Sequence, residues 1–175
     1  MFSLHTGGDQ STILYQLDRR KSPDLRYMDR HHLFDQLARH GEIFRTMLTG
    51  LRANEVLWKP EPVKWCALEV ACHLYDEERE DFRARLASTL ETPEKPWPKI
   101  DPQAWVAERG YIDLDLSSVL ADLLLERERS VSWLRGLADA PWDNVHMHPK
   151  VVLGRVDLRL MYCVANDLHR IRQVN

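Results

Sequence analysis

The chain carries four long stretches in which apolar residues recur at helical spacing, with no alternating pattern of the kind that marks strands. In the first stretch, one side of a helix would carry Leu33, Leu37, Phe44, Leu48 and Leu51. The pattern predicts four amphipathic helices, at 29–51, 66–90, 115–138 and 156–173. Because such helices bury their apolar stripes against one another, we expect an all-α fold, a four-helix bundle.

The link between the second and third predicted helices is long and contains four prolines, at positions 93, 96, 98 and 102. Proline interrupts helices, and a link of this length can return along the bundle. The second and third helices can therefore run parallel. Residues 1–28 have weak periodicity, so we predict an N-terminal extension at 1–28 and a single domain at 29–175.

The composition is that of a globular protein and excludes several function classes. Of the 175 residues, 44% are hydrophobic and 29% charged, and the net charge of −3 is spread over interspersed acids and bases. This gives no electrostatic footprint for nucleic acid or an anionic membrane. The longest apolar run, 160–165, cannot span a bilayer, and no signal-peptide pattern is present. With three cysteines and no CxxC motif, we expect reduced thiols in a cytoplasmic protein.

One segment, 58–78, combines a stiff loop with the start of a helix: WKPEPVKWCALEVACHLYDEE. Proline stiffens the loop, and its two tryptophans need a surface to pack on. The second helix is predicted to begin near Cys66, and Glu69 stands at the third position of a capping box. His73 follows inside the helix, and Glu77 lies one turn further on the same face.

This segment resembles the DinB/YfiT-like superfamily. The residues that match the family pattern there are Trp58, Pro60, Trp65, Glu69, His73, Leu74, Asp76 and Glu78, with Cys66 in place of the usual serine. Downstream, the His148-Pro149…Gly154…Leu158 series resembles the family's entry into its last helix. The closing stretch 166–173 resembles the family's final motif. The resemblance covers about 30–175 and implies an up-down-down-up bundle with a long crossover between helices two and three.

The resemblance also implies a divalent metal held by three histidines, one on the second helix and two on the last. His73 occupies the first position, but the other two fall on Asn166 and Arg170. Asparagine is a poor ligand for zinc or nickel, and arginine has no lone pair to donate. His169 lies about 100° around the helix from Arg170 and points elsewhere. The family's metal site is therefore expected to be degenerate.

Each candidate site residue has a functional and a structural interpretation. His73 is either a metal ligand or a buried histidine satisfied by a carbonyl or carboxylate. The His73–Glu77 pair could help to hold a metal, or be solvated. Arg170 could bind a carboxylate or phosphate in a pocket wall. Arg170 would share one face of the last helix with Arg159, Tyr162, Cys163, Asn166 and Gln173. The same face could equally be a polar interface.

Three further groups are weaker candidates. His146 and His148 could converge on a metal, although the resemblance gives them a loop role. The cysteines at 66, 72 and 163 lack a visible catalytic partner, so we expect them to be structural. Trp58, Trp65 and Trp142 are expected to pack on the ends of the bundle.

Two function classes remain open. The first is a protein of a stress-response family whose metal site is degenerate, acting as a small-molecule-binding or non-catalytic bundle without cofactor. The alternative, implied by the resemblance, is a zinc- or nickel-dependent transferase that conjugates a low-molecular-weight thiol to an electrophile, with Asn166, Glu77 or water completing the ligands around His73. In either case we expect a homodimer, with no nucleic acid or membrane partner.

Overall fold

Four long helical runs form where the apolar stripes predict them in the computed structural model, which describes residues 29–97, 99–148 and 151–174. They are α1 (Arg30–Leu48), the continuous run of α3 (Ala67–Asp76), η3 (Glu77–Phe82) and α4 (Arg83–Glu91), then α6 (Leu116–Gly136) and α7 (Val156–Val174). The predicted all-α four-helix bundle is confirmed. The predicted extension at 1–28 lies outside the described residues.

The ends of the long helices follow local chemistry. Asp29 and Asp115 cap α1 and α6, because each side chain accepts a hydrogen bond from a backbone N–H three residues later. Glu69 accepts from the Cys66 backbone N–H at 2.9 Å, as its spacing predicts, and also binds Lys59 of the preceding loop. Helix α1 ends three residues before the predicted boundary because Gly50 adopts a positive φ of 81°.

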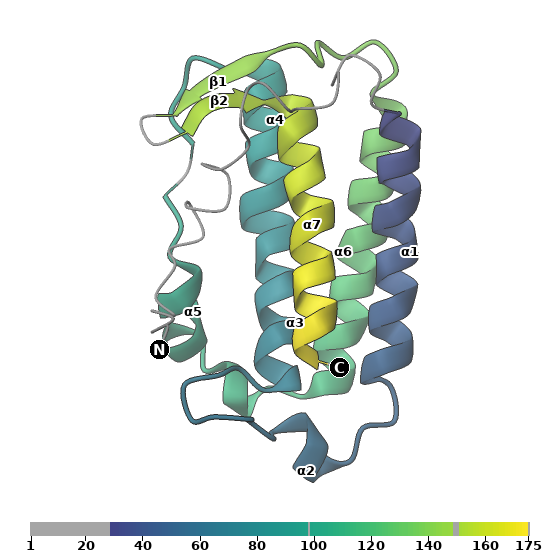
Figure 1. The fold of residues 1–175 in the computed structure, drawn as a ribbon, viewed down its shortest axis with the longest axis vertical. Coiled ribbons are helices and arrows are strands. Elements are labelled where there is room, and N and C mark those ends of the chain that lie inside the picture. Colours follow the sequence, from purple (N-terminus) through teal and green to yellow (C-terminus); the bar gives the residue numbers. More distant parts are fainter. Residues whose placement is uncertain (1–28, 98, 149–150, 175) are drawn as a thin grey trace, which may run out of the picture.

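The path of the chain gives the topology (Figure 1). Helix α1 runs down the bundle to the short α2 (Ala53–Val56), and α3 to α4 runs back up. The crossover then returns to the bottom through α5 (Pro102–Glu108) and η4 (Tyr111–Asp113), so that α6 runs up, parallel to α3 and α4, before α7 descends. The up-down-down-up order with a long crossover is confirmed.

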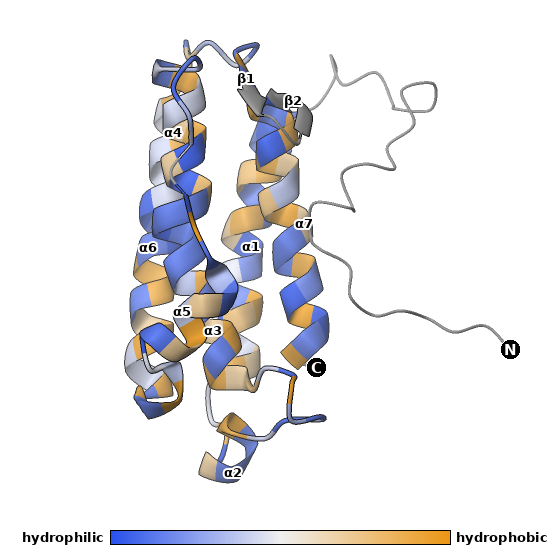
Figure 2. Ribbon diagram, turned by 90° about the vertical axis from the view of Figure 1, so that its left-hand side faces the viewer, coloured by the Kyte–Doolittle hydropathy of each residue, from blue (hydrophilic) through white to orange (hydrophobic). Residues whose placement is uncertain are grey.

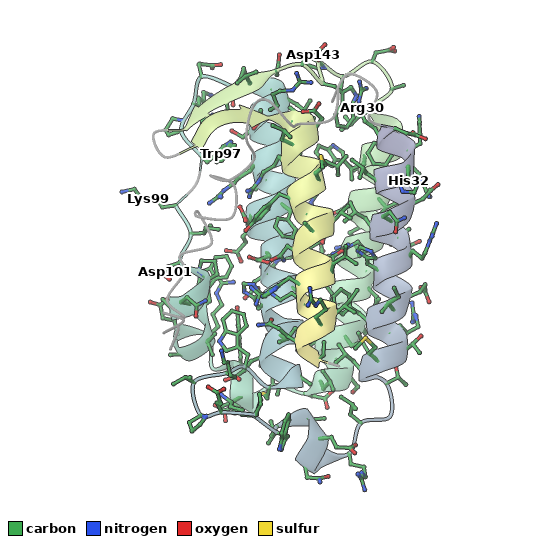
Figure 3. The ribbon with its side chains drawn as sticks, viewed as in Figure 1. Arg30, His32, Trp97, Lys99, Asp101 and Asp143 are labelled. Atoms are coloured by element: carbon green, nitrogen blue, oxygen red, sulfur yellow. The ribbon has the colours of Figure 1, made fainter. Side chains whose placement is uncertain are left out.

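A β-hairpin caps the upper end of the bundle, where only a loop was expected. Strands β1 (Val145–His148) and β2 (Val151–Arg155) pair antiparallel, with Val145 opposite Arg155. Strands this short carry too few positions for alternation to be recognised in the sequence. Trp97, on the crossover below the hairpin, stacks on His146 with ring centroids 4.2 Å apart and ties the two segments together (Figure 3).

The interior has apolar clusters at two levels, and each long helix carries both hydrophobic and hydrophilic residues (Figure 2). The lower cluster includes Phe44, Leu68, Leu74 and Leu123, and the upper one includes Phe34, Leu86, Leu134 and Leu160. Trp142 is buried against Phe34, and Trp65 is half-buried, as predicted. The expectation for Trp58 is wrong: 65% of it is exposed, on the loop below the bundle.

Between the clusters, each helical run contributes a buried charged or titratable side chain to one layer. We call this set the polar layer; it consists of His40, Glu78, Arg127 and Asp167. The second helical run passes this level as the π-helix η3, a wide turn that often marks functional sites. No helix in the described ranges is both long and apolar enough to cross a membrane.

Candidate functional site

Two of the predicted site residues lie one helical turn apart on the second helical run. His73 is 1% exposed and Glu77 2% exposed, so both are withdrawn from solvent. The His73 Nε2 atom is 3.0 Å from Glu77 Oε2, as the i, i+4 spacing predicts. The helix therefore presents an imidazole and a carboxylate together inside the bundle.

Helix α7 brings the two replaced family positions onto this pair. Asn166 Nδ2 donates to Glu77 Oε2 at 2.9 Å, and Arg170 Nη2 contacts His73 Nε2 at 2.7 Å. The four residues at the positions of the family's metal site and beside it thus lie in contact with one another. We call this group the arginine site: His73, Glu77, Asn166 and Arg170.

The Arg170 contact fixes where the His73 proton lies. A guanidinium can only donate, so the lone pair of His73 Nε2 faces Arg170 and the ring proton is on Nδ1. Glu77 Oε2, close to the same nitrogen, takes its hydrogen bond from Asn166 instead. His73 Nδ1 and Arg170 Nε are both buried without a hydrogen-bond partner among the described residues.

Two side chains, Trp65 and Gln173, enclose the arginine site on the side that faces the C-terminus. The Trp65 ring centroid lies 4.5 Å from that of His73 and 4.8 Å from Arg170 Cζ, a cation–π contact. Gln173, which is exposed, accepts from Arg170 Nη1 at 2.8 Å. Sequence reasoning placed Gln173 on this face, but it treated Trp65 as loop packing. The position of Trp65 eight residues before the buried histidine was the available signal.

Burial of Arg170 sets the electrostatics of the site. It lowers the pKa of Arg170, while the charge of Glu77 acts in the opposite direction. No described carboxylate comes within ion-pair distance of Arg170. The other two buried arginines differ in this respect, because Arg127 pairs with Asp167 and Glu78, and Arg159 pairs with Asp81.

Tyr162 and Cys163 were predicted on the same pocket wall, but they have other surroundings. The Tyr162 ring packs edge-on against Phe82 and lies below the Arg159 guanidinium. Burial and then the charge of Glu77 raise the pKa of Tyr162. The Cys163 thiol donates to the Arg159 carbonyl at 3.2 Å inside the upper apolar cluster.

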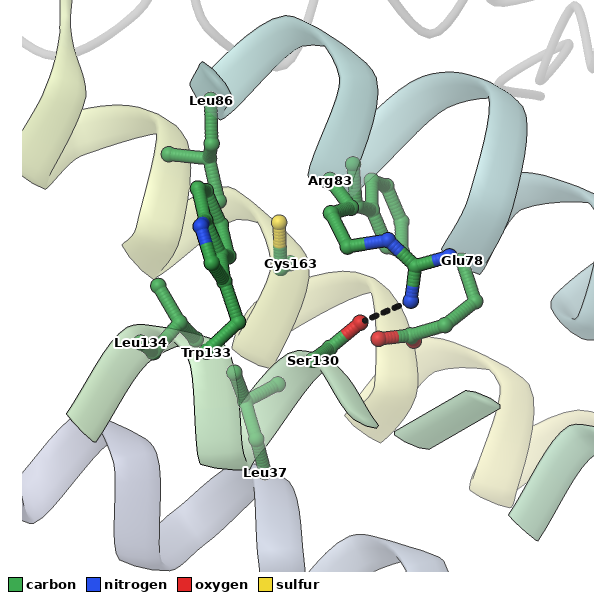
Figure 4. A pocket seen from close by; sticks show the side chains of 9 residues that line it. Leu37, Glu78, Arg83, Leu86, Ser130, Trp133, Leu134 and Cys163 are labelled. Atoms are coloured by element: carbon green, nitrogen blue, oxygen red, sulfur yellow. Dashed lines mark hydrogen bonds between the residues drawn. The ribbon is translucent and has the colours of Figure 1, made fainter. Parts of the chain in front are cut away.

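Cys163 lines a different space, a cavity of about 10 Å³ beside Glu78, Ser130 and Trp133 (Figure 4). Such a volume holds about one water molecule and no organic ligand. Burial raises the pKa of the Cys163 thiol well above its ordinary value. Cys163 is therefore a packing residue and does not belong to the arginine site.

The two hairpin histidines do not form a described metal site. His146 is buried and its Nδ1 donates to the Pro93 carbonyl at 2.9 Å, which fixes it to the crossover. The side chain of His148 lies outside what the structure describes. The interpretation of His146 and His148 as a metal pair is thus not supported by the contacts of His146.

The polar layer is the feature that sequence reasoning missed. Arg127 forms two hydrogen bonds with Asp167 and an ion pair with Glu78 at 2.9 Å, and His40 Nδ1 lies 3.2 Å from Asp167. Its signal was an arginine in the inward stripe of the third helix, one turn after Leu123. Since this layer contacts α1, η3, α6 and α7, it joins all four helices.

The donor set does not fit a transition metal as it stands. Within the described ranges, no group of three or more His, Cys, Asp or Glu side chains is placed to hold one. The one imidazole of the arginine site already accepts from a guanidinium, and a metal at its lone pair would face that positive charge.

Comparisons with known proteins agree with the fold and the motifs. The sequence profile of the DinB superfamily matches residues 36–167. Among solved structures, the chain is similar to YfiT from Bacillus subtilis, described as a probable metal-dependent hydrolase with an unusual four-helix bundle topology. The TM-score is 0.77 at 18% identity, over 90% of this chain and 89% of YfiT. No curated protein matches the chain. Because the profile covers most of its length, the chain belongs to the DinB superfamily.

Proposed function

We propose that this protein is a small-molecule-binding, non-catalytic bundle in which an arginine has taken the place of the family's metal. The observation that carries the proposal is the 2.7 Å contact between Arg170 Nη2 and His73 Nε2. The lone pair that would bind the metal accepts a hydrogen bond from a side chain that stays protonated in proteins. Asn166 supports this state, because its amide nitrogen, not its oxygen, faces Glu77.

The energies favour the arginine over a metal. A tight structural zinc site supplies about 10–16 kcal/mol, shared among four good ligands. A dication 4 Å from a guanidinium is repelled by about 8 kcal/mol at an effective dielectric constant of 20. Replacing two imidazoles by an amide and a cation therefore removes most of the affinity before any cost of moving Arg170.

The alternative is a metal-dependent transferase that conjugates a low-molecular-weight thiol to an electrophile. The description of YfiT as metal-dependent keeps this class in view, although YfiT shares only the fold at 18% identity. It would require Arg170 to leave His73, and Glu77 and Asn166 to turn toward the metal. We therefore rank it second.

The test restores the missing imidazoles. The double variant Asn166→His with Arg170→His should bind zinc or nickel at one ion per chain in calorimetric titrations, while the unmodified protein binds neither. The matched control, Asn166→Gln with Arg170→Gln, changes the same positions without adding ligands and should stay metal-free. A folded double-histidine variant that binds no metal would show that the assumed metal position is wrong.

We also propose that the partner is a second copy of this chain in the cytoplasm. Support for this proposal comes from α7, where Met161 is 36% exposed and Leu168, two turns later, is 48% exposed. Light scattering should give about twice the chain mass of 20.6 kDa. A monomer mass at high protein concentration would refute the dimer.

A further inference from the structure

We infer that the arginine site binds an oxyanion, the carboxylate or phosphate group of a small molecule, on the guanidinium of Arg170. This inference rests on the proposed function, since it requires the site to be free of metal. It adds the chemical class of the ligand and the atoms that would receive it.

The first support is that Arg170 has no direct ion-pair partner in the described part of the chain, although the charge of Glu77 acts on it from a longer distance. Arg170 is 2% exposed, yet among the described residues it has no carboxylate partner, whereas the buried Arg127 and Arg159 are both ion-paired. An unpaired buried charge costs free energy, and buried charges in proteins are usually paired with a group of opposite charge. The nearest acid, Glu77, is occupied by Asn166 and lies toward His73.

The second support is unused hydrogen-bonding capacity. The proton on His73 Nδ1 is a buried donor without an acceptor among the described residues. Arg170 Nε is a second such donor at the same site, although the Nε atoms of Arg127 and Arg159 also lack an acceptor there. Native proteins leave few such donors unsatisfied. The Nε edge of a guanidinium is suited to two parallel hydrogen bonds with a carboxylate or phosphate.

The third support is a route by which a ligand could reach the Arg170 guanidinium. Gln173 Oε1 sits 2.8 Å from Arg170 Nη1, where it acts as a neutral stand-in for an anion oxygen. Because Gln173 is exposed, its side chain can swing into water at little cost and free Nη1 of the guanidinium as a further donor. The Trp65 ring, against the guanidinium, would form an apolar wall for the body of the ligand.

The last turn of α7 adds positive potential around this entrance. Burial lowers the pKa of His169, and the neighbouring charges of Arg170 and Arg172 lower it further. An exposed Arg172 is explained by the helix dipole, which favours cations at a C-terminus. Arg170, being buried, is not explained by that effect alone.

The experiment follows the Nε–Hε resonance of Arg170 in ¹H–¹⁵N spectra of the full chain, assigned with the Arg170→Lys variant. Inorganic phosphate and sodium acetate are the probes, and sodium chloride at matched ionic strength is the blank. We expect a saturable shift with at least one probe and none with chloride. A response to phosphate alone assigns a phosphate ligand, and a response to acetate alone assigns a carboxylate.

Two variants and one control sharpen the result. Arg170→Lys, followed through the Trp65 indole resonance, should weaken binding at least about tenfold, because lysine keeps the charge but loses the paired donors. Gln173→Ala should tighten it, since the competing acceptor is gone. Arg45→Gln removes an exposed arginine on α1 and should leave binding unchanged.

Equal responses to chloride and to both probes in the unmodified protein and in Gln173→Ala would overturn the inference, even if Arg170→Lys fails to fold. Zinc titration of the same samples separates the two proposals. Absence of anion binding in a protein that also binds no zinc refutes the oxyanion alone, whereas stoichiometric zinc on His73 refutes the proposed function.

Discussion

Replacing Arg127 by methionine should destabilise the protein more than any other single substitution of a charged residue in the described part of the chain. Arg127 is 3% exposed and makes ion pairs with Asp167 and Glu78, and its Nη1 also donates to the Leu37 carbonyl. Methionine keeps much of the aliphatic packing, so the change mainly removes the charge and its donors.

The magnitude follows from what is left behind. Breaking one buried ion pair by removing one partner costs about 3–5 kcal/mol. Here one cation serves two buried carboxylates, so we expect at least about 4 kcal/mol at pH 7. With a urea m-value of about 2 kcal/mol/M, the unfolding midpoint should fall by about 2 M.

The loss should also depend on pH. Burial alone would raise the pKa of Asp167, but the charge and hydrogen bonds of Arg127, with His40, lower it below the ordinary value. In the native protein this carboxylate contributes stability above its unfolded pKa, about 4, and that contribution is lost as the pH falls through the folded pKa. Without Arg127, the carboxylates of Asp167 and Glu78 can take up protons and lose their buried charge. The difference in unfolding free energy between the variant and the unmodified protein should therefore become smaller as the pH falls from 7 to 4.

The assay is urea unfolding followed by far-UV circular dichroism at pH 7 and pH 4. Arg129→Met is the matched control on the same helix, because Arg129 is 61% exposed and its pair with Glu126 is worth at most about 1 kcal/mol. A deficit for Arg127→Met no larger than that of the control, or one that grows at pH 4, would refute the account of the polar layer.

Two further perturbations test burial elsewhere. Burial raises the pKa of all three cysteine thiols, that of Cys72 to about 12, so dithionitrobenzoate at pH 8 should titrate no thiol in the native protein and three in urea. A thiol that reacts rapidly before unfolding would contradict this. Trp142→Ala should cost about 3–5 kcal/mol of unfolding free energy, because Trp142 is buried against Phe34, while Trp58→Ala should stay within about 0.5 kcal/mol. Thermal melts of the two variants compare them directly, and similar melting temperatures would show that Trp58 is packed.

The helices were predictable because each has a continuous apolar stripe, and the stripe and its turns set the boundaries to within a few residues. The π-helical turn η3 could not be predicted, because a single wider turn barely changes the spacing of apolar residues along the helix. The pairing of β1 and β2 was missed for a related reason, since it depends on backbone hydrogen bonds at the end of the bundle and on the His146–Trp97 stack.

The site was predictable as a set of residues but not as a set of contacts. The motif register was enough to bring His73, Asn166 and Arg170 together. Which atom of Arg170 meets which nitrogen of His73 depends on side-chain packing that no spacing rule encodes. The same limit misplaced Cys163, which shares a helical face with Asn166 but turns into the apolar cluster.

The central claim, that Arg170 has replaced the metal, is tested most directly by metal content. The protein should be produced without a histidine tag, incubated with equimolar zinc or nickel, desalted and measured by mass spectrometry of the metal. The account predicts a substoichiometric amount that does not change in His73→Gln, because the His73 lone pair already accepts from Arg170. One metal ion per chain, lost in His73→Gln, would contradict it.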